Sequence, residues 1–177
     1  MELQIFDVEH GACALLTCDN NTRIMFDCGH NAKTGWAPGS HLRSIGVNNL
    51  EMLVITNYDE DHVSGLLNLR ASVSIGRLWR NMTVTPDILK KLKFEDGMGD
   101  GIEELIDMAS TYTGDGGFPQ FLGVEYQAFH LNYPEFEDEN NLSFVVQMKL
   151  NDVGFLFPGD LEKKGWETLL ARNARFR

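Results

Sequence analysis

The sequence predicts a single-domain, sheet-rich α/β sandwich rather than a plain doubly wound parallel sheet. The first strands follow one another in hairpins, later strands mix with helices, and no linker or low-complexity segment interrupts the 177 residues. A chain of this length is long enough to bury a substantial core as one domain, here residues 1–177.

The N-terminal third is expected to contain four strands and one helix. The CDNNT segment, rich in Asp and Asn, predicts a hairpin between the second and third strands. Gly46 marks the end of the helix, because only glycine easily adopts a positive φ there. The predicted elements are strands LQIFDV (3–8), ACALLT (12–17), RIMFDCG (23–29) and MLVIT (52–56), and helix PGSHLRSIG (38–46).

Further along, a helix is expected after the acidic loop, and helices and strands then alternate. Thr85 and Pro86 predict the N-cap and first residue of another helix. In IEELIDMA (102–109) the apolar residues share one helical face. The other predicted elements are strand GRLWRN (76–81), loop TGDGG (113–117), strands VEYQAFHL (124–131), SFVVQMKL (143–150) and VGFLFPG (153–159), and helix LEKKGWETLLARNA (161–174).

Composition narrows the class of protein. The net charge of −11 argues against broad electrostatic binding of nucleic acid. The three cysteines, Cys13, Cys18 and Cys28, lie in or beside apolar segments and are expected to be reduced core residues. No bilayer-length apolar run and no export signal is found in these residues, so a cytoplasmic protein without membrane contact is expected.

The TNYDEDHVSG segment, residues 56–65, places three acids and a histidine directly after a predicted core strand. Like charges in a partly desolvated place repel one another unless a cation compensates them. The loop is therefore either a solvated acidic turn or half of a metal site.

This loop resembles the HxHxDH signature of the metallo-β-lactamase superfamily, and more closely its HxDxDH variant in the hydrolase domains of ComEC-like competence proteins. Three further segments are similar in order and position. FDVEHGACALL resembles the family's entry hairpin DVGQGDAILI, IMFDCG its LIDAG, and NNLSFVVQMKLNDVGFLFPGD its NSLVL…FLLTGD. The resemblance extends from residue 4 to about residue 170.

The resemblance implies a metallo-β-lactamase-type αββα sandwich and a metal-dependent hydrolase. Phosphodiester cleavage by a metal-bound hydroxide, as in a nuclease or phosphodiesterase, is the expected activity. Alternatives are a thioester, lactam or lactone hydrolase of the same fold, or a degenerate binding or regulatory member. The implied metal ligands are Asp59, Asp61, His62 and Asp160, with Asn57 at the position of the first histidine; Asp61 and Asp160 are also expected to be catalytic.

One or two divalent ions are expected in this donor set. Oxygen donors in place of imidazole favour Mn²⁺ or Mg²⁺, although Zn²⁺ also remains compatible. Asp27, His10, His30 and Asn141 are expected to support the ligands rather than to bind the metal.

Each assignment has a structural alternative. Asp59 and Asp61 would be solvated turn acids, and Asp160 would cap the helix that follows it. His10 and His30 would be ordinary structural histidines.

The sequence departs from the family pattern in two ways. Asn57 replaces a histidine, and its amide oxygen binds Zn²⁺ poorly, so Asn140, Asn141, Ser143 or His30 are further candidates at that position. The family also continues with a strand and a His-His-Gly-Ser motif, whereas this chain stops at Arg177. We therefore expect a C-terminally truncated fragment, or a second chain that completes the site.

The stretch from residue 70 to residue 93 is locally basic despite the acidic total. It forms either a face that grips nucleic acid or another phosphodiester substrate, or an ordinary solvated helix face. Its basic residues are Arg70, Arg77, Arg80, Lys90, Lys91 and Lys93.

Overall fold

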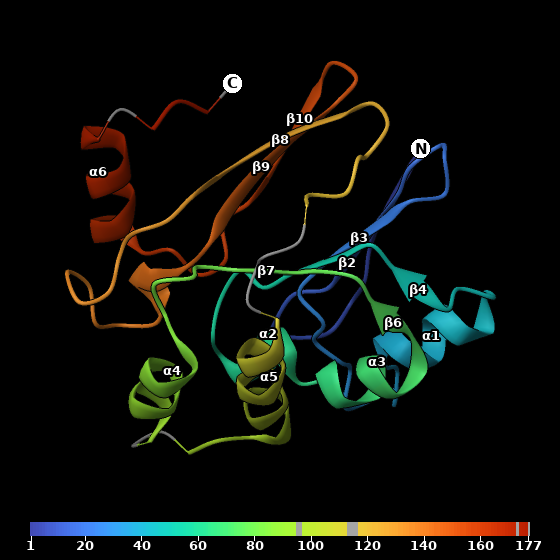
Figure 1. Cartoon of the computed structure of the whole chain (residues 1–177), viewed down its shortest axis with the longest axis horizontal. Helices are drawn as coiled ribbons and strands as arrows, with labels where there is room; N and C mark the ends of the chain where they lie inside the picture. Colours follow the sequence, from blue (N-terminus) through green and yellow to red (C-terminus); the bar gives the residue numbers. More distant parts are fainter. Residues whose placement is uncertain (95–96, 113–116, 173, 177) are drawn as a thin grey trace.

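The computed structural model describes residues 1–94, 97–112, 117–172 and 174–176 (Figure 1). This part of the chain is mixed α/β with several sheets, which confirms the predicted α/β class. The first sheet has the order β1 (Glu2–Ile5), β2 (Ala14–Thr17), β3 (Arg23–Phe26), β5 (Met52–Val54), β7 (Leu78–Trp79). The second has the order β10 (Val153–Phe157), β9 (Val145–Leu150), β8 (Val124–Phe129), and β4 (Asn49–Leu50) pairs with β6 (Ser74–Ile75).

Short helices connect these strands. They are α1 (Pro38–Ser44), α2 (Glu60–Val63), α3 (Leu66–Ser72), α4 (Pro86–Lys93), α5 (Asp100–Thr111), the 3₁₀ helix η1 (Asn140–Leu142) and α6 (Lys163–Ala171). Within the described ranges, none of the helices has the length and apolar character that crossing a bilayer requires.

The five-stranded sheet separates two hydrophobic clusters, because successive side chains of a strand point to opposite faces. Leu15, Met25 and Leu53 face the cluster that contains the buried sides of α1, α3 and α5. Leu16 and Val54 face the other cluster, which is shared with β9 of the second sheet. Figure 1 shows the same order, with α1, α3 and α5 on the side of the first sheet away from β8, β9 and β10.

Strand β3 joins the two halves of the five-stranded sheet. It pairs antiparallel with β2, as the predicted hairpin requires, and parallel with β5. Because parallel strands end at the same edge of a sheet, the residues after Phe26 and after Val54 emerge side by side. In open α/β sheets such an edge is the usual place for a ligand.

An aromatic pair connects the two sheets beneath this edge. The rings of Phe26 in β3 and Phe157 in β10 are stacked, with centroids 3.9 Å apart and an interplanar angle of 8°. Each phenylalanine ends its strand, so the pair aligns the carboxyl ends of β3 and β10.

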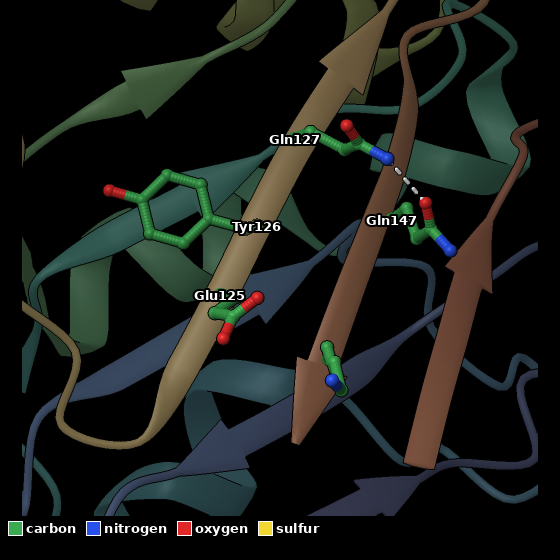
Figure 2. Close-up of a pocket in the computed structure, with 5 residues that line it drawn as sticks. Glu125, Tyr126, Gln127 and Gln147 are labelled. Carbon is green, nitrogen blue, oxygen red and sulfur yellow. Dashed lines mark hydrogen bonds between the residues drawn. The ribbon is translucent and has the colours of Figure 1, made fainter. Parts of the chain in front are cut away.

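Part of the face of the second sheet that points away from the first sheet is polar. Gln127 of β8 and Gln147 of β9 are cross-strand partners, and the Gln127 amide donates a 2.5 Å hydrogen bond to Gln147 (Figure 2). Glu125 and Lys149 line the same shallow pocket. The predicted site residues do not line this face.

Several elements differ from the sequence-based expectation. The helix predicted after the acidic loop is divided into α2 and α3 at Gly65, where a Cβ would lie 2.5 Å from the Cys28 carbonyl oxygen. The predicted strand at 76–81 is reduced to β7, and the C-terminal helix extends only from Lys163 to Ala171. Residues 113–116 of the predicted TGDGG loop lie outside the described residues.

Other predictions are confirmed. Thr85 caps α4 by accepting a hydrogen bond from the Ile88 N–H, and Gly46 ends α1 with a φ of 75°. The three cysteines are free and buried. The predicted apolar face of α5 is buried at Ile102, Leu105, Ile106 and Ala109.

Candidate metal centre

A cleft lies at the edge where β3 and β5 end, and it is closed on the opposite side by the segment after β10. Its volume is ≈ 350 Å³. Asp27, Asp61, His62 and Asp160 all line it, so the structure brings four of the predicted site residues into one cavity. His10 lines it as well.

Asp27 forms the buried floor of the cleft. Its carboxylate is 1% exposed and accepts hydrogen bonds from the Thr56 N–H (2.7 Å), the Thr56 hydroxyl and His62 Nδ1 (2.9 Å). The backbone of Asp27 has a φ of 52°, a left-handed conformation that costs on the order of 1–3 kcal/mol in a non-glycine residue. The three hydrogen bonds offset that cost and fix the carboxylate under the imidazole.

His62 lies between two carboxylates and is 3% exposed. Its Nε2 is 3.2 Å from Asp160 Oδ2, on the ring edge opposite Asp27. Burial lowers the pKa of His62, but the hydrogen bond to Asp27 and the charges of Asp27, Asp160 and Asp61 outweigh burial and raise this pKa to about 9. In the metal-free protein the ring is therefore an imidazolium that donates from both nitrogens at neutral pH.

This geometry predicts a pH dependence of the metal-free protein. The folded pKa of about 9 lies above the ordinary value of 6.5, so the stabilisation is complete below pH 6.5 and is lost as the pH rises through about 9. We expect the Tm in EDTA to fall across that window, and to fall less in His62→Gln. Equal slopes in both proteins would contradict the assignment to His62.

The loop that carries Asp160 is fastened to the acidic loop. Ser143 Oγ accepts a 3.2 Å hydrogen bond from the Asp160 N–H, and the Phe144 N–H donates to the Thr56 carbonyl (2.7 Å). Gly159 has a φ of 58°, and a Cβ there would lie 2.6 Å from the Thr56 carbonyl oxygen. Asp160 does not cap α6, because the N-cap residue is Glu162; that alternative is wrong.

Asp61 reaches the cleft from the first turn of α2, and its side chain is exposed. Two glycines let the chain pack against its backbone. A Cβ on Gly11 would lie 2.1 Å, and one on Gly29 2.4 Å, from the Asp61 carbonyl oxygen. Close backbone packing therefore sets the position of the Asp61 carboxylate.

Asp59 and Asn57 point elsewhere. Asp59 Oδ1 accepts a 2.5 Å hydrogen bond from Lys93 Nζ, and Asp59 lines a separate pocket at η1. The Asn57 amide, 0% exposed, donates to Asn140 and Ser143 and accepts from the Asp59 N–H. The structure therefore does not bring either residue into the cleft with His62.

The remaining candidates are dispersed. Asn141 is buried beside Asp138, which accepts a 2.8 Å hydrogen bond from its amide, and it lies at the η1 pocket. His30 is partly buried, and its backbone N–H donates a hydrogen bond to Ser64 Oγ (3.1 Å). His10 is exposed at the mouth of the cleft.

Glu60 has a role that sequence reasoning missed. Its carboxylate accepts hydrogen bonds from the Gly101 N–H (2.9 Å) and the Ile102 N–H (3.0 Å), so it caps α5. The N-cap residue of α5 is Gly99, which has no side chain to supply that acceptor. A glycine before the helix leaves its first N–H groups without a side-chain acceptor. In sequence, this was the signal that an acid from elsewhere would cap α5.

The predicted basic face is largely occupied by internal contacts. Arg80 is buried and donates to the carbonyls of Val84 and Asn81. Arg70 is paired with Glu104 and Asp107. Lys93 is buried as well.

Three side chains of the cleft carry atoms of the kinds that hold divalent ions in proteins. Nitrogen from His62 and oxygen from Asp61 and Asp160 form an oxygen-rich donor set of the kind that favours Mn²⁺ or Mg²⁺ and is also compatible with Zn²⁺. As the side chains stand, no three His, Cys, Asp or Glu residues of the described ranges converge closely enough to hold an ion. Binding of an ion by His62 would require Nε2 to lose its proton, because metal-binding histidines are neutral.

Comparison with known proteins finds a distant relative. No protein-family model matches the chain. Over 132 residues it is 26% identical to ComE operon protein 3 of Bacillus subtilis (strain 168). The matched part covers 73% of this chain and only 16% of that protein. The chain is distantly related to ComE operon protein 3.

Proposed function

We propose that this chain is a metal-dependent hydrolase of the metallo-β-lactamase αββα type that cleaves phosphodiester bonds. The observation that carries the proposal is His62, whose two ring nitrogens face Asp27 and Asp160 in a cleft that also contains Asp61. The order of helices, first sheet and second sheet supports the fold. The similarity to ComE operon protein 3 supports the relationship.

Three side chains would hold the ion: Asp61, His62 and Asp160. When bound, a divalent ion supplies a Lewis acid and a water molecule of lowered pKa. Asp27 would fix the orientation of the imidazole from the opposite edge, as carboxylates commonly do for metal-bound histidines. Metal ligation by Asp59 and Asn57, and a further donor from another segment or chain, stay predictions.

The polar groups of the cleft have separate tasks in this proposal. Asp160, whose side chain is 46% exposed, and Asp61 remain within reach of a substrate, while Asp27 and His62 are buried and hydrogen-bonded to each other. Oxygen-rich coordination favours Mn²⁺ or Mg²⁺, the ions that commonly accompany phosphate chemistry. Nucleic acid or another phosphodiester is accordingly the proposed substrate.

The test is hydrolysis of bis(p-nitrophenyl) phosphate and of single-stranded DNA with Mn²⁺, Mg²⁺ or Zn²⁺. We expect turnover that EDTA abolishes and that Asp61→Asn removes, while Asp152→Asn in the β9–β10 turn retains it. A β-lactam, a lactone and a thioester test the alternative substrate classes. Wild-type and Asp61→Asn proteins that behave identically would overturn the proposal.

A non-catalytic binding member is the second candidate. It is favoured because Asp59 and Asn57 are held by protein groups and no three suitable side chains in the described part converge. Metal binding without turnover of any of these substrates would select it over the hydrolase.

A further inference from the structure

A buried lysine contacts the acidic loop that also carries Asp61 and His62. Lys93, the last residue of α4, is 5% exposed. Its Nζ is 2.5 Å from Asp59 Oδ1 and 3.2 Å from Glu139 Oε1. An ammonium group is rarely buried without paired carboxylates, because its desolvation is costly. The three charged groups therefore form one unit, which joins α4 to the acidic loop and to the segment before η1.

The unit keeps its charges. Burial lowers the pKa of Lys93, but the hydrogen bond to Asp59 and the charges of Asp59 and Glu139 outweigh burial and raise this pKa. The two carboxylates at hydrogen-bonding distance stabilise the ammonium form, so Lys93 carries a positive charge between them. It neutralises acids that would otherwise repel one another and the neighbouring Asp61.

Asn57, the other metal ligand expected beside Asp59, is also occupied by protein groups rather than open to a metal ion. Both hydrogen-bonding groups of the buried Asn57 amide have protein partners: its oxygen accepts from the Asp59 N–H, and its nitrogen donates to Asn140 and Ser143. An ion at that position would have to displace these hydrogen bonds and also lie beside the Lys93 ammonium. Like charges so close repel strongly.

We propose that the Lys93 ammonium replaces the metal ion that Asp59 and Asn57 would otherwise hold. The centre then binds a single divalent ion, at Asp61, His62 and Asp160. This inference rests on the proposed function for the site of that ion. Asp59 is then a partner of lysine rather than a metal ligand, and the acidic loop serves an internal cation and a metal at the same time.

Titration of metal-free protein with MnCl₂ by calorimetry tests the proposal. We expect one equivalent to bind to the wild type, and Asp59→Asn to keep that stoichiometry and affinity. Asp160→Asn is expected to weaken binding at least about 10-fold. Lys93→Met, which leaves Asp59 and Glu139 without their cation, is expected to bind a second equivalent, whereas Lys93→Arg keeps one.

Two equivalents in the wild type, with one of them lost in Asp59→Asn, would overturn the proposal. One equivalent in a folded Lys93→Met protein would overturn it too. Since Lys93→Met removes a buried charge and can fail to fold, Asp59→Asn is the arm that decides in that case.

A wild type that binds no Mn²⁺ would refute the proposed hydrolase. Thermal unfolding in EDTA then tests whether the Lys93 ammonium and Asp59 form a stabilising pair. Asp59→Asn, Lys93→Met and the double variant form a cycle of Tm values. A double variant that loses less than the sum of the single losses supports the pair. Additive losses overturn it.

Discussion

Asp160→Asn is expected to abolish Mn²⁺-dependent phosphodiester hydrolysis and to weaken Mn²⁺ binding by about 10–100-fold or more, the range found when even a supporting contact of a metal site is lost. The asparagine keeps the size of the side chain but removes the anionic oxygen that faces His62 Nε2 at 3.2 Å. The fold is expected to be retained, because the backbone N–H of residue 160 still donates to Ser143 Oγ.

Asp152→Asn is the matched control, since it removes one carboxylate from the exposed β9–β10 turn and leaves the cleft unchanged. Calorimetry and initial rates measure binding and turnover separately. Wild-type Mn²⁺ affinity in Asp160→Asn would show that the ion, if one binds, does not use the segment after β10.

Asp27→Ala is expected to have the largest effect on stability, with a loss of about 3–5 kcal/mol in the free energy of unfolding. The substitution leaves the Thr56 N–H, the Thr56 hydroxyl and His62 Nδ1 without their shared acceptor in a buried place. It also puts alanine at a φ of 52°, which aspartate and asparagine tolerate better. Urea unfolding in EDTA measures the loss.

Asp27→Asn provides the comparison, because it keeps the backbone preference and one carbonyl oxygen while it removes the charge. Its loss is expected to be smaller, about 1–3 kcal/mol. If Asp27→Ala were as stable as the wild type, the hydrogen bonds of Asp27 would not hold the floor of the cleft.

The sequence predicted those parts of the fold that depend on neighbouring residues. Thr85 with Pro86 was enough to locate the start of α4, and the hairpin of β2 and β3 follows from its turn residues. The break between α2 and α3 could not be predicted in the same way. It depends on how closely Gly65 approaches Cys28 and Pro38, which lie 37 and 27 positions earlier in the chain.

The acidic loop shows the same limit at the site. Its three acids look alike in sequence, yet Asp59 contacts Lys93, Glu60 caps α5 and Asp61 faces the cleft. The family resemblance led us to expect Asp27, Asp61, His62 and Asp160 close together, because the segments that carry them follow β3, β5 and β10. The partners of Asp59 and Glu60 come from helices that contribute no part of the motif.

The stacked rings of Phe26 and Phe157 have a consequence for the affinity of the cleft for a ligand. Phe26 directly precedes Asp27, and Phe157 lies three residues before Asp160. Their stacking therefore sets the distance between the two segments that carry these carboxylates. Apolar substitutions at Phe26 or Phe157 are therefore expected to change the affinity of the proposed metal site without altering any donor atom.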